Sequence, residues 1–252
     1  MKLLAIGAIA VLTGCATSAS YSPTSRTAVD LLDASRDRHI PIKLYFPTHQ
    51  ICTRRSPCPV AFISQGYGLR HTDYSFIANS LTETGYLVVS IQHDLPSDPA
   101  INKTGDLIEN RTPMWQRGAQ NIRFVRDTLS HSYPRFSWPS LVLIGHSNGG
   151  DLSALALQES PTLASTLITL DNRRYPLPRT SSIKLLSIRG SDYSADSGVL
   201  PATQEVGTRT CITTIAGARH NDLNDYGPAD LKSKINAIIL TFLRSGQCGE
   251  SH

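Results

Sequence analysis

Ser147 is the residue of this 252-residue chain whose surroundings best suit a chemical role. The apolar residues 141–144 predict a buried strand, and the apolar spacing after residue 151 predicts a helix. Between them, Gly145–Gly149 reads Gly-His-Ser-Asn-Gly and matches G-x-S-x-G, a sharp strand-to-helix turn that presents a serine hydroxyl. The glycines permit this tight turn, and the helix N-terminus favours negative charge developing at the serine. The predicted strand and helix favour this interpretation over an ordinary glycine-rich turn.

A serine hydroxyl becomes a useful nucleophile only beside a base, and that base needs an acid to orient it. His220 is one of two histidines after Ser147, and the other is the C-terminal residue. It falls in the loop between the last predicted strand and the last predicted helix, so we expect His220 to be the base. Asp171 and Asp192 each follow a predicted strand, and both would lie at the same sheet edge as the serine. Asp196 is a weaker third candidate for the acid.

Acyl chemistry also needs two N–H groups that stabilise the developing oxyanion. The first is expected from Asn148, which follows the serine. The second is expected from Tyr67, within the loop Ser64–Gly68 after the apolar run 60–63, because the loop's glycines let its backbone approach a substrate. A simple turn at the end of a strand is the alternative for this loop. Three further residues are candidates to shape the substrate cleft, although each could equally serve packing: Gln65, Trp115 and His93.

The rest of the sequence predicts a framework that would hold these residues. Segments 27–33 and 40–46 alternate apolar and polar residues and predict an antiparallel hairpin, with Pro41 at an edge. Further strands are expected at 60–63, 86–92, 141–144, 165–170, 183–188 and 211–215. Helices are expected from Thr72 to Gly85, from the cap Thr112 and first residue Pro113 onward, after Ser147, and from Pro228 to Gly246. A long polar loop is expected over 95–111. This alternation is typical of an α/β fold whose mostly parallel sheet is covered on both faces, without a large cap domain.

Together these motifs resemble the α/β-hydrolase superfamily, and more narrowly the platelet-activating-factor acetylhydrolase group and its bacterial relatives. Three segments carry the resemblance: Ser64–Gly68 (Ser-His-Gly-x-Gly in that group, with Gln65 here at the histidine), Gly145–Gly150, and Leu170–Asp171 followed by Pro176–Leu177. The resemblance spans roughly residues 40–242. It favours Asp171 over Asp192 as the acid, and it implies a Ser-His-Asp esterase that needs no metal or organic cofactor.

The expected activity is therefore that of a serine carboxylic-ester hydrolase, of the carboxylesterase, lipase and acetylhydrolase kind (class 3.1.1), acting on short-chain or lipid-derived esters. A peptidase or amidase would use the same residues, but no extra domain is expected to hold a peptide. A non-catalytic binding module on the same fold is a further alternative, and it would have no reason to retain Ser147, His220 and two eligible acids. The net charge of +4 comes from scattered basic residues, so nucleic acid is not an expected partner.

Residues 1–14 resemble the signal peptide of a bacterial lipoprotein. One positive charge precedes an apolar run too short to span a bilayer. Leu12–Cys15 resembles a lipobox, in which the cysteine is acylated, for example with palmitate, and becomes the first mature residue. Because Ala16 rather than aspartate follows, the resemblance implies a lipid anchor in the outer membrane, facing the periplasm or the surface. A plain secretory peptide and a periplasmic or secreted protein are the alternative.

Residues 15–25 are expected to form a flexible tether, and residues 26–248 a single domain of ordinary globular composition. Four cysteines remain after Cys15, an even number that suits an oxidising compartment. Two disulfides are plausible, with free thiols as the alternative: Cys52–Cys58 and Cys211–Cys248. No C-x2-C pair with partner histidines is present, so no metal site is expected.

Overall fold

The computed structural model describes residues 26–102, 104–205 and 209–248. The expected leader and tether over residues 1–25, including Cys15, lie outside the described residues. The elements follow in this order: β1 (Arg26–Asp33), β2 (Arg38–Tyr45), β3 (Cys58–Ser64), α1 (Ser75–Glu83), β4 (Leu87–Ile91), α2 (Leu107–Ser132), β5 (Phe136–His146), α3 (Asn148–Glu159), β6 (Thr166–Leu170), β7 (Lys184–Arg189), η1 (Thr203–Glu205), β8 (Thr210–Thr214), η2 (His220–Asp222) and α4 (Ala229–Ser245). The η elements are short 3-10 helices.

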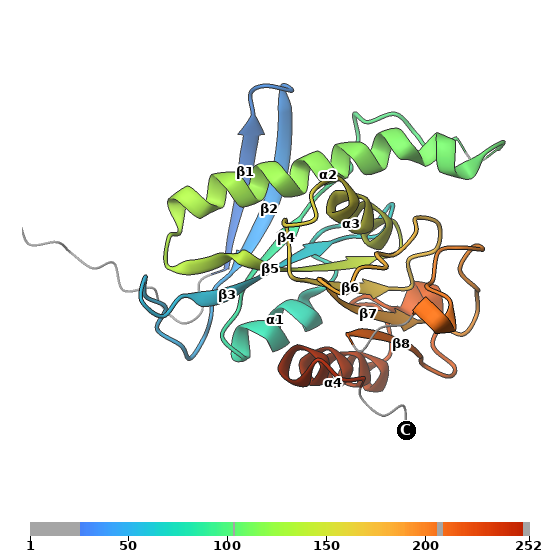
Figure 1. Ribbon diagram of the computed structural model, residues 1–252. Helices are drawn as coiled ribbons and strands as arrows, with labels where there is room; N and C mark the ends of the chain where they lie inside the picture. The colour runs from blue at the N-terminus through green and yellow to red at the C-terminus, as the bar shows by residue number, and fades with distance from the viewer. Residues whose placement is uncertain (1–25, 103, 206–208, 249–252) are drawn as a thin grey trace, which may run out of the picture.

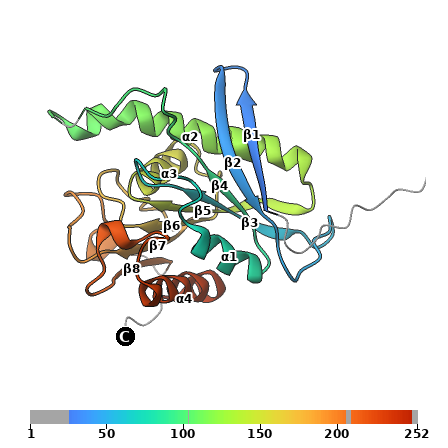
Figure 2. The same ribbon diagram turned by 180° about the vertical axis from the view of Figure 1, so that it is seen from behind.

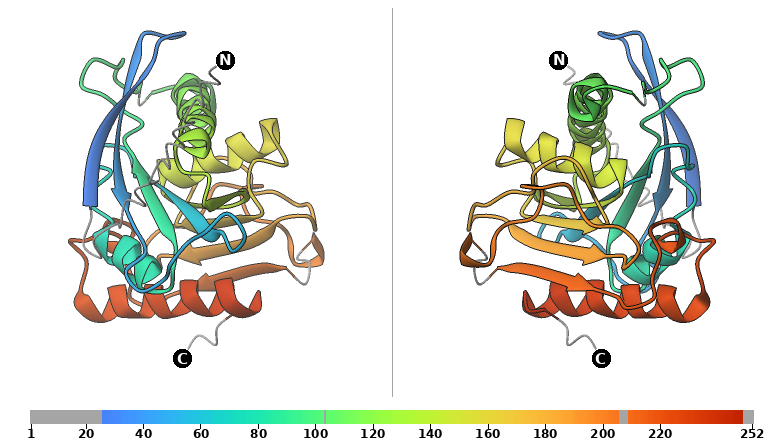
Figure 3. Two further views of the ribbon diagram at one scale, coloured as in Figure 1. Left: turned by 90° about the vertical axis from the view of Figure 1, so that its left-hand side faces the viewer. Right: turned by 90° about the vertical axis from the view of Figure 1, so that its right-hand side faces the viewer.

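In the described part of the chain, eight strands form one sheet in the order β1-β2-β4-β3-β5-β6-β7-β8. β1 and β2 form an antiparallel hairpin, and β2 is also antiparallel to β4. Every other pair of neighbours is parallel. Figure 3 shows the hairpin (blue) at one edge of the sheet and α4 (red) below the sheet. The predicted mostly parallel sheet with an N-terminal antiparallel hairpin is therefore confirmed.

Helices cover both faces of the sheet. Figures 1 and 2 show α2 and α3 on one face and α1 and α4 on the other. Each helix pair buries its apolar side chains against the sheet, and two core clusters result. The inner strands β4 and β6 are buried along their whole length, as expected for strands covered on both faces. This packing fixes the ends of the parallel strands, where the candidate site lies.

Pro41 does not lie on an edge strand, contrary to expectation, because β2 pairs with β1 on one side and β4 on the other. The Gln92 N–H donates to the Pro41 carbonyl at 2.9 Å. Proline has no N–H with which to complete that pair. The register of β2 with β4 consequently ends at Ile42, opposite Ile91. The proline is tolerated because it stands where the ladder stops.

Two predicted helix starts are also wrong. α2 begins at Leu107, five residues before Thr112, and Pro113 lies inside it. Asp106 caps this helix by accepting the N–H groups of Ile108 and Glu109. The expected loop over 95–111 is therefore shorter than predicted. Pro113 is the seventh residue of α2, so it costs the helix one hydrogen bond, and the length of the helix tolerates that loss.

α1 begins at Ser75 instead of near Thr72. Its first N–H groups are held by Asp225, whose carboxylate accepts from Ser75 at 2.8 Å and from Phe76 at 3.0 Å. The capping residue lies 150 positions further along the chain. A cap of this kind leaves no local signal in the sequence.

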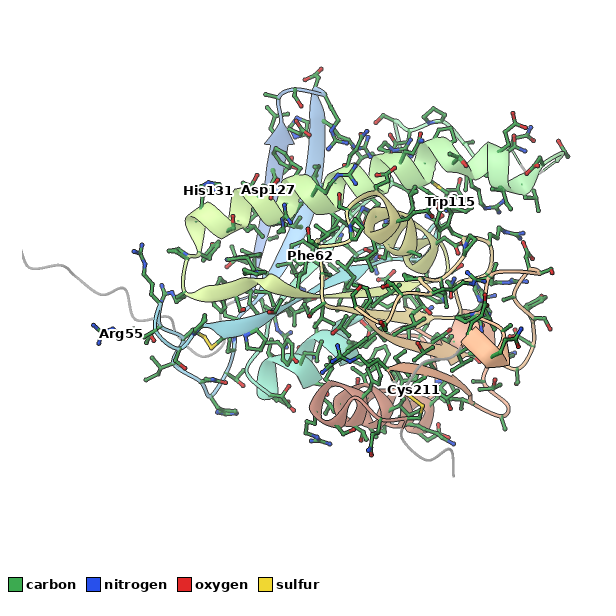
Figure 4. All side chains as sticks on the ribbon, viewed as in Figure 1. Arg55, Phe62, Trp115, Asp127, His131 and Cys211 are labelled. Atoms are coloured by element: carbon green, nitrogen blue, oxygen red, sulfur yellow. A yellow bond between two sulfur atoms is a disulfide. The ribbon has the colours of Figure 1, made fainter. Side chains whose placement is uncertain are left out.

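Two disulfides are present, Cys52–Cys58 and Cys211–Cys248, as the cysteine count predicted. Figure 4 shows the sulfur of Cys211 near α4. Disulfides persist in oxidising compartments, which agrees with a periplasmic or extracellular location. Among the described residues, no helix has both the length and the apolar character that crossing a membrane requires.

Candidate active site

Ser147 stands at the turn between β5 and α3. Its backbone has φ 51° and ψ −118°, a conformation that L-residues other than glycine rarely adopt. A Cβ on Gly145 would collide with the backbone of Gly149, and a Cβ on Gly149 would collide with the Ser64 carbonyl. The two glycines thus let the elbow pack against itself and against the end of β3. The turn predicted from G-x-S-x-G is present at this position.

His220 lies between the serine and an acid. Its Nε2 is 3.0 Å from the Ser147 hydroxyl oxygen, and its Nδ1 is 2.5 Å from Oδ2 of Asp171. His220 begins η2, after β8, while Asp171 follows β6. The three side chains therefore come from the ends of different parallel strands and form one continuous line of hydrogen bonds. The spacing suits transfer of the serine proton to the imidazole.

Asp171 is fully buried, but it is surrounded by donors. Burial alone would raise its pKa, yet the hydrogen bond with His220 and the nearby Arg189 guanidinium hold the pKa below its usual value. Arg189, from β7, lies 2.9 Å from Oδ1, and the Gly190 N–H donates to the same oxygen at 3.2 Å. The carboxylate thus stays ionised at neutral pH and can orient the His220 ring.

The other two candidate acids contact different groups. Oδ1 of Asp192 accepts the backbone N–H of His220 at 2.9 Å, so this carboxylate holds the loop rather than the ring. Asp196 forms an ion pair with Arg174 at 3.1 Å. Of the three aspartates weighed from the sequence, Asp171 is the one that meets the imidazole.

Tyr67 and Asn148 line the same pocket as Ser147 and His220. Neither backbone N–H finds an acceptor among the described residues. Asn148 is the first residue of α3, where N–H groups have no partner within the helix. N–H groups without acceptors in a pocket that holds a serine hydroxyl can stabilise an oxyanion, and this role stays a prediction for Tyr67 and Asn148.

Comparison with known proteins adds information on the fold. No family model matches the sequence, and no curated protein matches it. Solved structures do resemble it. A ferulic acid esterase from Streptomyces cinnamoneus has a TM-score of 0.62 at 16% identity, over 92% of this chain and 91% of the other. A dienelactone hydrolase from Anabaena variabilis has a TM-score of 0.59 at 13% identity, over 88% and 98%. A Xanthomonas campestris protein, an α/β serine hydrolase without a lid, has a TM-score of 0.55 at 16% identity, over 87% and 96%.

The chain has the α/β-hydrolase fold. At such low identity these likenesses establish the fold and leave the activity to be argued from the site. Within this fold the candidate nucleophile Ser147, acid Asp171 and base His220 follow one another along the chain. Ser, Asp, His is also the chain order of the superfamily.

The three residues expected to shape the cleft of this α/β-hydrolase fold lie behind it. Gln65 and His93 are each 1% exposed and Trp115 is fully buried. The Trp115 indole donates to the Asn148 side chain at 2.7 Å, and the His93 ring meets the Ser64 hydroxyl at 2.9 Å. With its amide turned to match its neighbours, Gln65 donates to the carbonyl of Ile91. These side chains brace the loops around the site.

His146, inside the elbow, is also buried, and burial lowers its pKa to about 3. Its Nε2 lies 3.0 Å from the carbonyl oxygen of His220. A neutral ring can donate there, so His146 supports the loop that carries the candidate base.

The pocket at Ser147 has a volume of about 190 Å³ and contains charged residues that the sequence did not single out. They are Arg111 from α2 and Asp151 from α3, with Arg173 and Arg174 from the segment after β6. The pair of arginines two and three residues after Asp171 was a usable signal, since residues close in sequence to an expected acid lie near the site. Arg111 was hidden because the start of α2 was misplaced. Among the described residues, no group of histidine, cysteine, aspartate or glutamate side chains could hold a metal ion.

Proposed function

We propose that this chain is a serine hydrolase that cleaves carboxylic esters through an acyl-enzyme. The observation that carries the proposal is the place of His220, 3.0 Å from the Ser147 hydroxyl and 2.5 Å from Asp171. The strained backbone of Ser147 and the unpaired N–H groups of its pocket support the same chemistry. The α/β-hydrolase fold adds support, because it holds many such enzymes.

In the proposed mechanism, the Ser147 oxygen attacks the ester carbonyl carbon while Nε2 of His220 takes the serine proton. Asp171 holds the imidazole in the right tautomer and stabilises its positive charge. The N–H groups of Tyr67 and Asn148 bind the oxyanion of the tetrahedral intermediate. The C–O bond to the alcohol then breaks, and His220 gives its proton to the leaving oxygen. Water, deprotonated by His220, attacks the acyl-enzyme by the same route and releases the acid.

Hydrolysis of 4-nitrophenyl esters from acetate to palmitate, by protein starting at residue 16, tests this proposal. Wild-type protein should turn over part of the series, and Ser147→Ala should fall to background while keeping the wild-type circular dichroism spectrum. A fluorophosphonate probe should label wild-type protein and leave Ser147→Ala unlabelled. Folded wild-type protein that neither hydrolyses any ester nor reacts with the probe would overturn the proposal and favour a binding module.

A peptidase or amidase could use the same residues, but amine leaving groups need stronger protonation and tighter positioning. The pocket of about 190 Å³ at Ser147 is too small for an extended peptide. Parallel assays with 4-nitroanilides, the amide counterparts of the esters, separate the two activities. We expect esters to be hydrolysed at least 100-fold faster than these amides.

We further propose that the protein works at the cell envelope on short-chain or lipid-derived esters, as the resemblance to the acetylhydrolase group implies. The lipobox-like residues Leu12–Cys15 support a lipid anchor, and the two disulfides support an exported protein. Metabolic labelling with a palmitate analogue should mark the full chain and leave Cys15→Ser unmarked. A soluble, unlabelled full-length protein would favour a plain secretory leader.

A further inference from the structure

Positive charge surrounds the small pocket at Ser147. Arg111, Arg173 and Arg174 all line it. They come from two separate parts of the chain, since Arg111 lies near the start of α2 and the other two follow β6. Figure 1 shows the start of α2 (green) and the loops after the central strands at the same end of the molecule. The arginines therefore converge on the pocket through the tertiary fold.

Two of these arginines lack an acidic partner. Arg174 forms an ion pair with Asp196 at 3.1 Å. In the described part of the chain, neither Arg111 nor Arg173 forms an ion pair, and Nε of Arg173 is buried without an acceptor. Burial and the neighbouring Arg174 guanidinium lower the pKa of Arg111 by more than the Asp151 and Asp196 carboxylates raise it, so the nearby acids do not fully offset the positive charge there. Crowded, partly buried cations with unused N–H donors favour an anion between them.

Arg173 is held close to the proposed base. Its guanidinium carbon lies 4.3 Å from the centre of the Tyr193 ring. That ring in turn packs edge-on to the His220 ring, at 6.5 Å between centres. A planar guanidinium resting on an aromatic face keeps its N–H groups in a fixed direction. The charge of Arg173 is therefore positioned, rather than free to swing into solvent.

Asp151 is the negative group in the pocket, but its charge is already compensated within the chain. Its Oδ1 accepts the backbone N–H groups of Arg173, Arg174 and Tyr175 at 3.0–3.2 Å. Burial raises its pKa to about 6, so the carboxylate is still mostly ionised at neutral pH, but the three arginines of the pocket outnumber it. The role of Asp151 is then to fix the segment that carries the two arginines.

A second pocket, of about 560 Å³, shares Tyr67 with the first. Proline and leucine side chains supply much of its lining: Pro41, Leu69, Leu95, Pro96 and Pro99. An ester whose carbonyl lies at Ser147 could thus place a compact anionic part beside the arginines and a bulkier apolar part beyond Tyr67.

We propose that the substrate of this site is an ester that carries a free carboxylate, bound by Arg111 and Arg173 next to the scissile carbonyl. The inference rests on the proposed ester hydrolysis and narrows it to anionic substrates. A guanidinium matches a carboxylate with two parallel N–H···O bonds. The carboxylate could belong to the acyl part or to the alcohol part of the ester, and both sources share this recognition chemistry.

Two matched substrate pairs test the proposal. Mono-4-nitrophenyl glutarate and 4-nitrophenyl pentanoate differ in a carboxylate on the acyl side. 3-Acetoxybenzoate and 3-acetoxybenzamide differ in a carboxylate on the alcohol side. We expect wild-type protein to favour the charged member of one pair by about tenfold or more in kcat/KM, as charge-assisted hydrogen bonds imply. That advantage should shrink as salt is raised, since salt screens the attraction.

Arg111→Gln and Arg173→Gln should each reduce the charged-to-neutral ratio of kcat/KM by about tenfold. Arg55→Gln is the matched control, because Arg55 is exposed on the Cys52–Cys58 loop, far from the site (Figure 4). The ratio of this control should equal that of the wild type.

Preference for the neutral member of both pairs would overturn the anionic substrate while leaving ester hydrolysis intact. A preference for the charged substrate that persists in both Arg111→Gln and Arg173→Gln would also overturn the proposed anionic substrate. Hydrolysis of no ester together with an unlabelled Ser147 would instead overturn the proposed function itself. The salt dependence of the wild type needs no variant, so the proposal stays open to disproof even if an arginine variant fails to fold.

Discussion

The Tyr74 hydroxyl lies 2.7 Å from Nδ1 of His146, and both side chains are buried. The same hydroxyl accepts the Gly66 N–H at 2.9 Å, while Nε2 of His146 is 3.0 Å from the His220 carbonyl. A continuous series of hydrogen bonds thus joins the loop that carries Tyr67, the elbow, and the loop of the proposed base. The side chains of Tyr74 and His146, which do not line the pocket, therefore fix the relative positions of these three parts of the proposed site.

Tyr74→Phe should loosen this arrangement without removing any proposed catalytic group. The change leaves the Gly66 N–H and Nδ1 of His146 buried without partners, at a cost of about 1–3 kcal/mol for such groups. We expect a lower free energy of unfolding by that amount in urea titrations, and a kcat reduced severalfold with little change in KM. Tyr226→Phe is the control: it removes hydrogen bonds with Arg70 and Asp73 near the surface, so it should lower the free energy of unfolding by about 1 kcal/mol at most and leave kcat unchanged. A Tyr74→Phe variant with wild-type kcat would show that the series has no part in catalysis.

The two aspartates that the sequence offered as the acid, with Asp171 favoured over Asp192, should differ sharply in their effect. Asp171→Asn removes the carboxylate that orients the imidazole, so kcat should fall by about 10³- to 10⁴-fold. Asp192→Asn keeps an oxygen that can accept the His220 N–H, and its kcat should stay within about tenfold of the wild type. Steady-state hydrolysis of one ester by both variants provides the comparison. The reverse order of effects would assign the role of the acid to Asp192.

Buried neutral histidines should make stability depend on pH. Burial lowers the pKa of His93 from 6.5 to about 3, so between these values the unfolded chain binds more protons than the folded chain. The free energy of unfolding should therefore fall as the pH is lowered from about 6.5, by up to about 1.4 kcal/mol per pH unit for this group. His93→Gln, whose amide can still reach the Ser64 hydroxyl, should reduce that slope.

His131→Gln is the control for this experiment, because His131 is exposed near the end of α2 (Figure 4). Urea titrations of the three proteins between pH 4.5 and 7.5 supply the slopes. Equal slopes for wild type and His93→Gln would mean that His93 takes up a proton in the folded chain.

The backbone of Ser147 leads to an unusual expectation for two inactive variants. With φ at 51°, any side chain at this position is strained by about 1 kcal/mol or more, and glycine relieves the strain. Ser147→Gly should therefore be more stable to heat than Ser147→Ala, whereas glycine is normally the less stable of the two. Differential scanning calorimetry of both variants measures the difference. A lower Tm for Ser147→Gly would show that the elbow is not strained.

The sequence predicted the order of strands and helices along the chain and the approach of His220 to Ser147, because both depend on patterns along the chain. Apolar runs mark the parallel strands, and the elbow has its own spacing. Position in the chain alone did not separate Asp171 from Asp192, since each follows a parallel strand, and only the resemblance to a known family favoured Asp171. Their distinct hydrogen bonds to one histidine appear only in three dimensions.

Other features depended on contacts between distant segments. The cap that Asp225 provides for α1 and the approach of Arg111 to Arg173 arise from residues far apart in sequence. The three expected cleft residues were misplaced for two reasons. Gln65 and His93 follow strand ends, where a polar side chain can point behind a site as readily as into it, and Trp115 lies on the buried face of α2. Gln65, His93 and Trp115 took the inner positions, where each found a hydrogen-bonding partner.

The disulfide between Cys211 and Cys248 also bears on when the protein matures. It spans 37 positions of the sequence, and His220 lies inside the covalent ring that it closes. Closing a ring of this length lowers the entropy of the unfolded chain enough to add about 4 kcal/mol of stability. A newly made chain in a reducing cytoplasm would lack that restraint on the loop of the proposed base. The proposed hydrolytic activity would then arise in step with the proposed export, which would spare the esters of the producing cell.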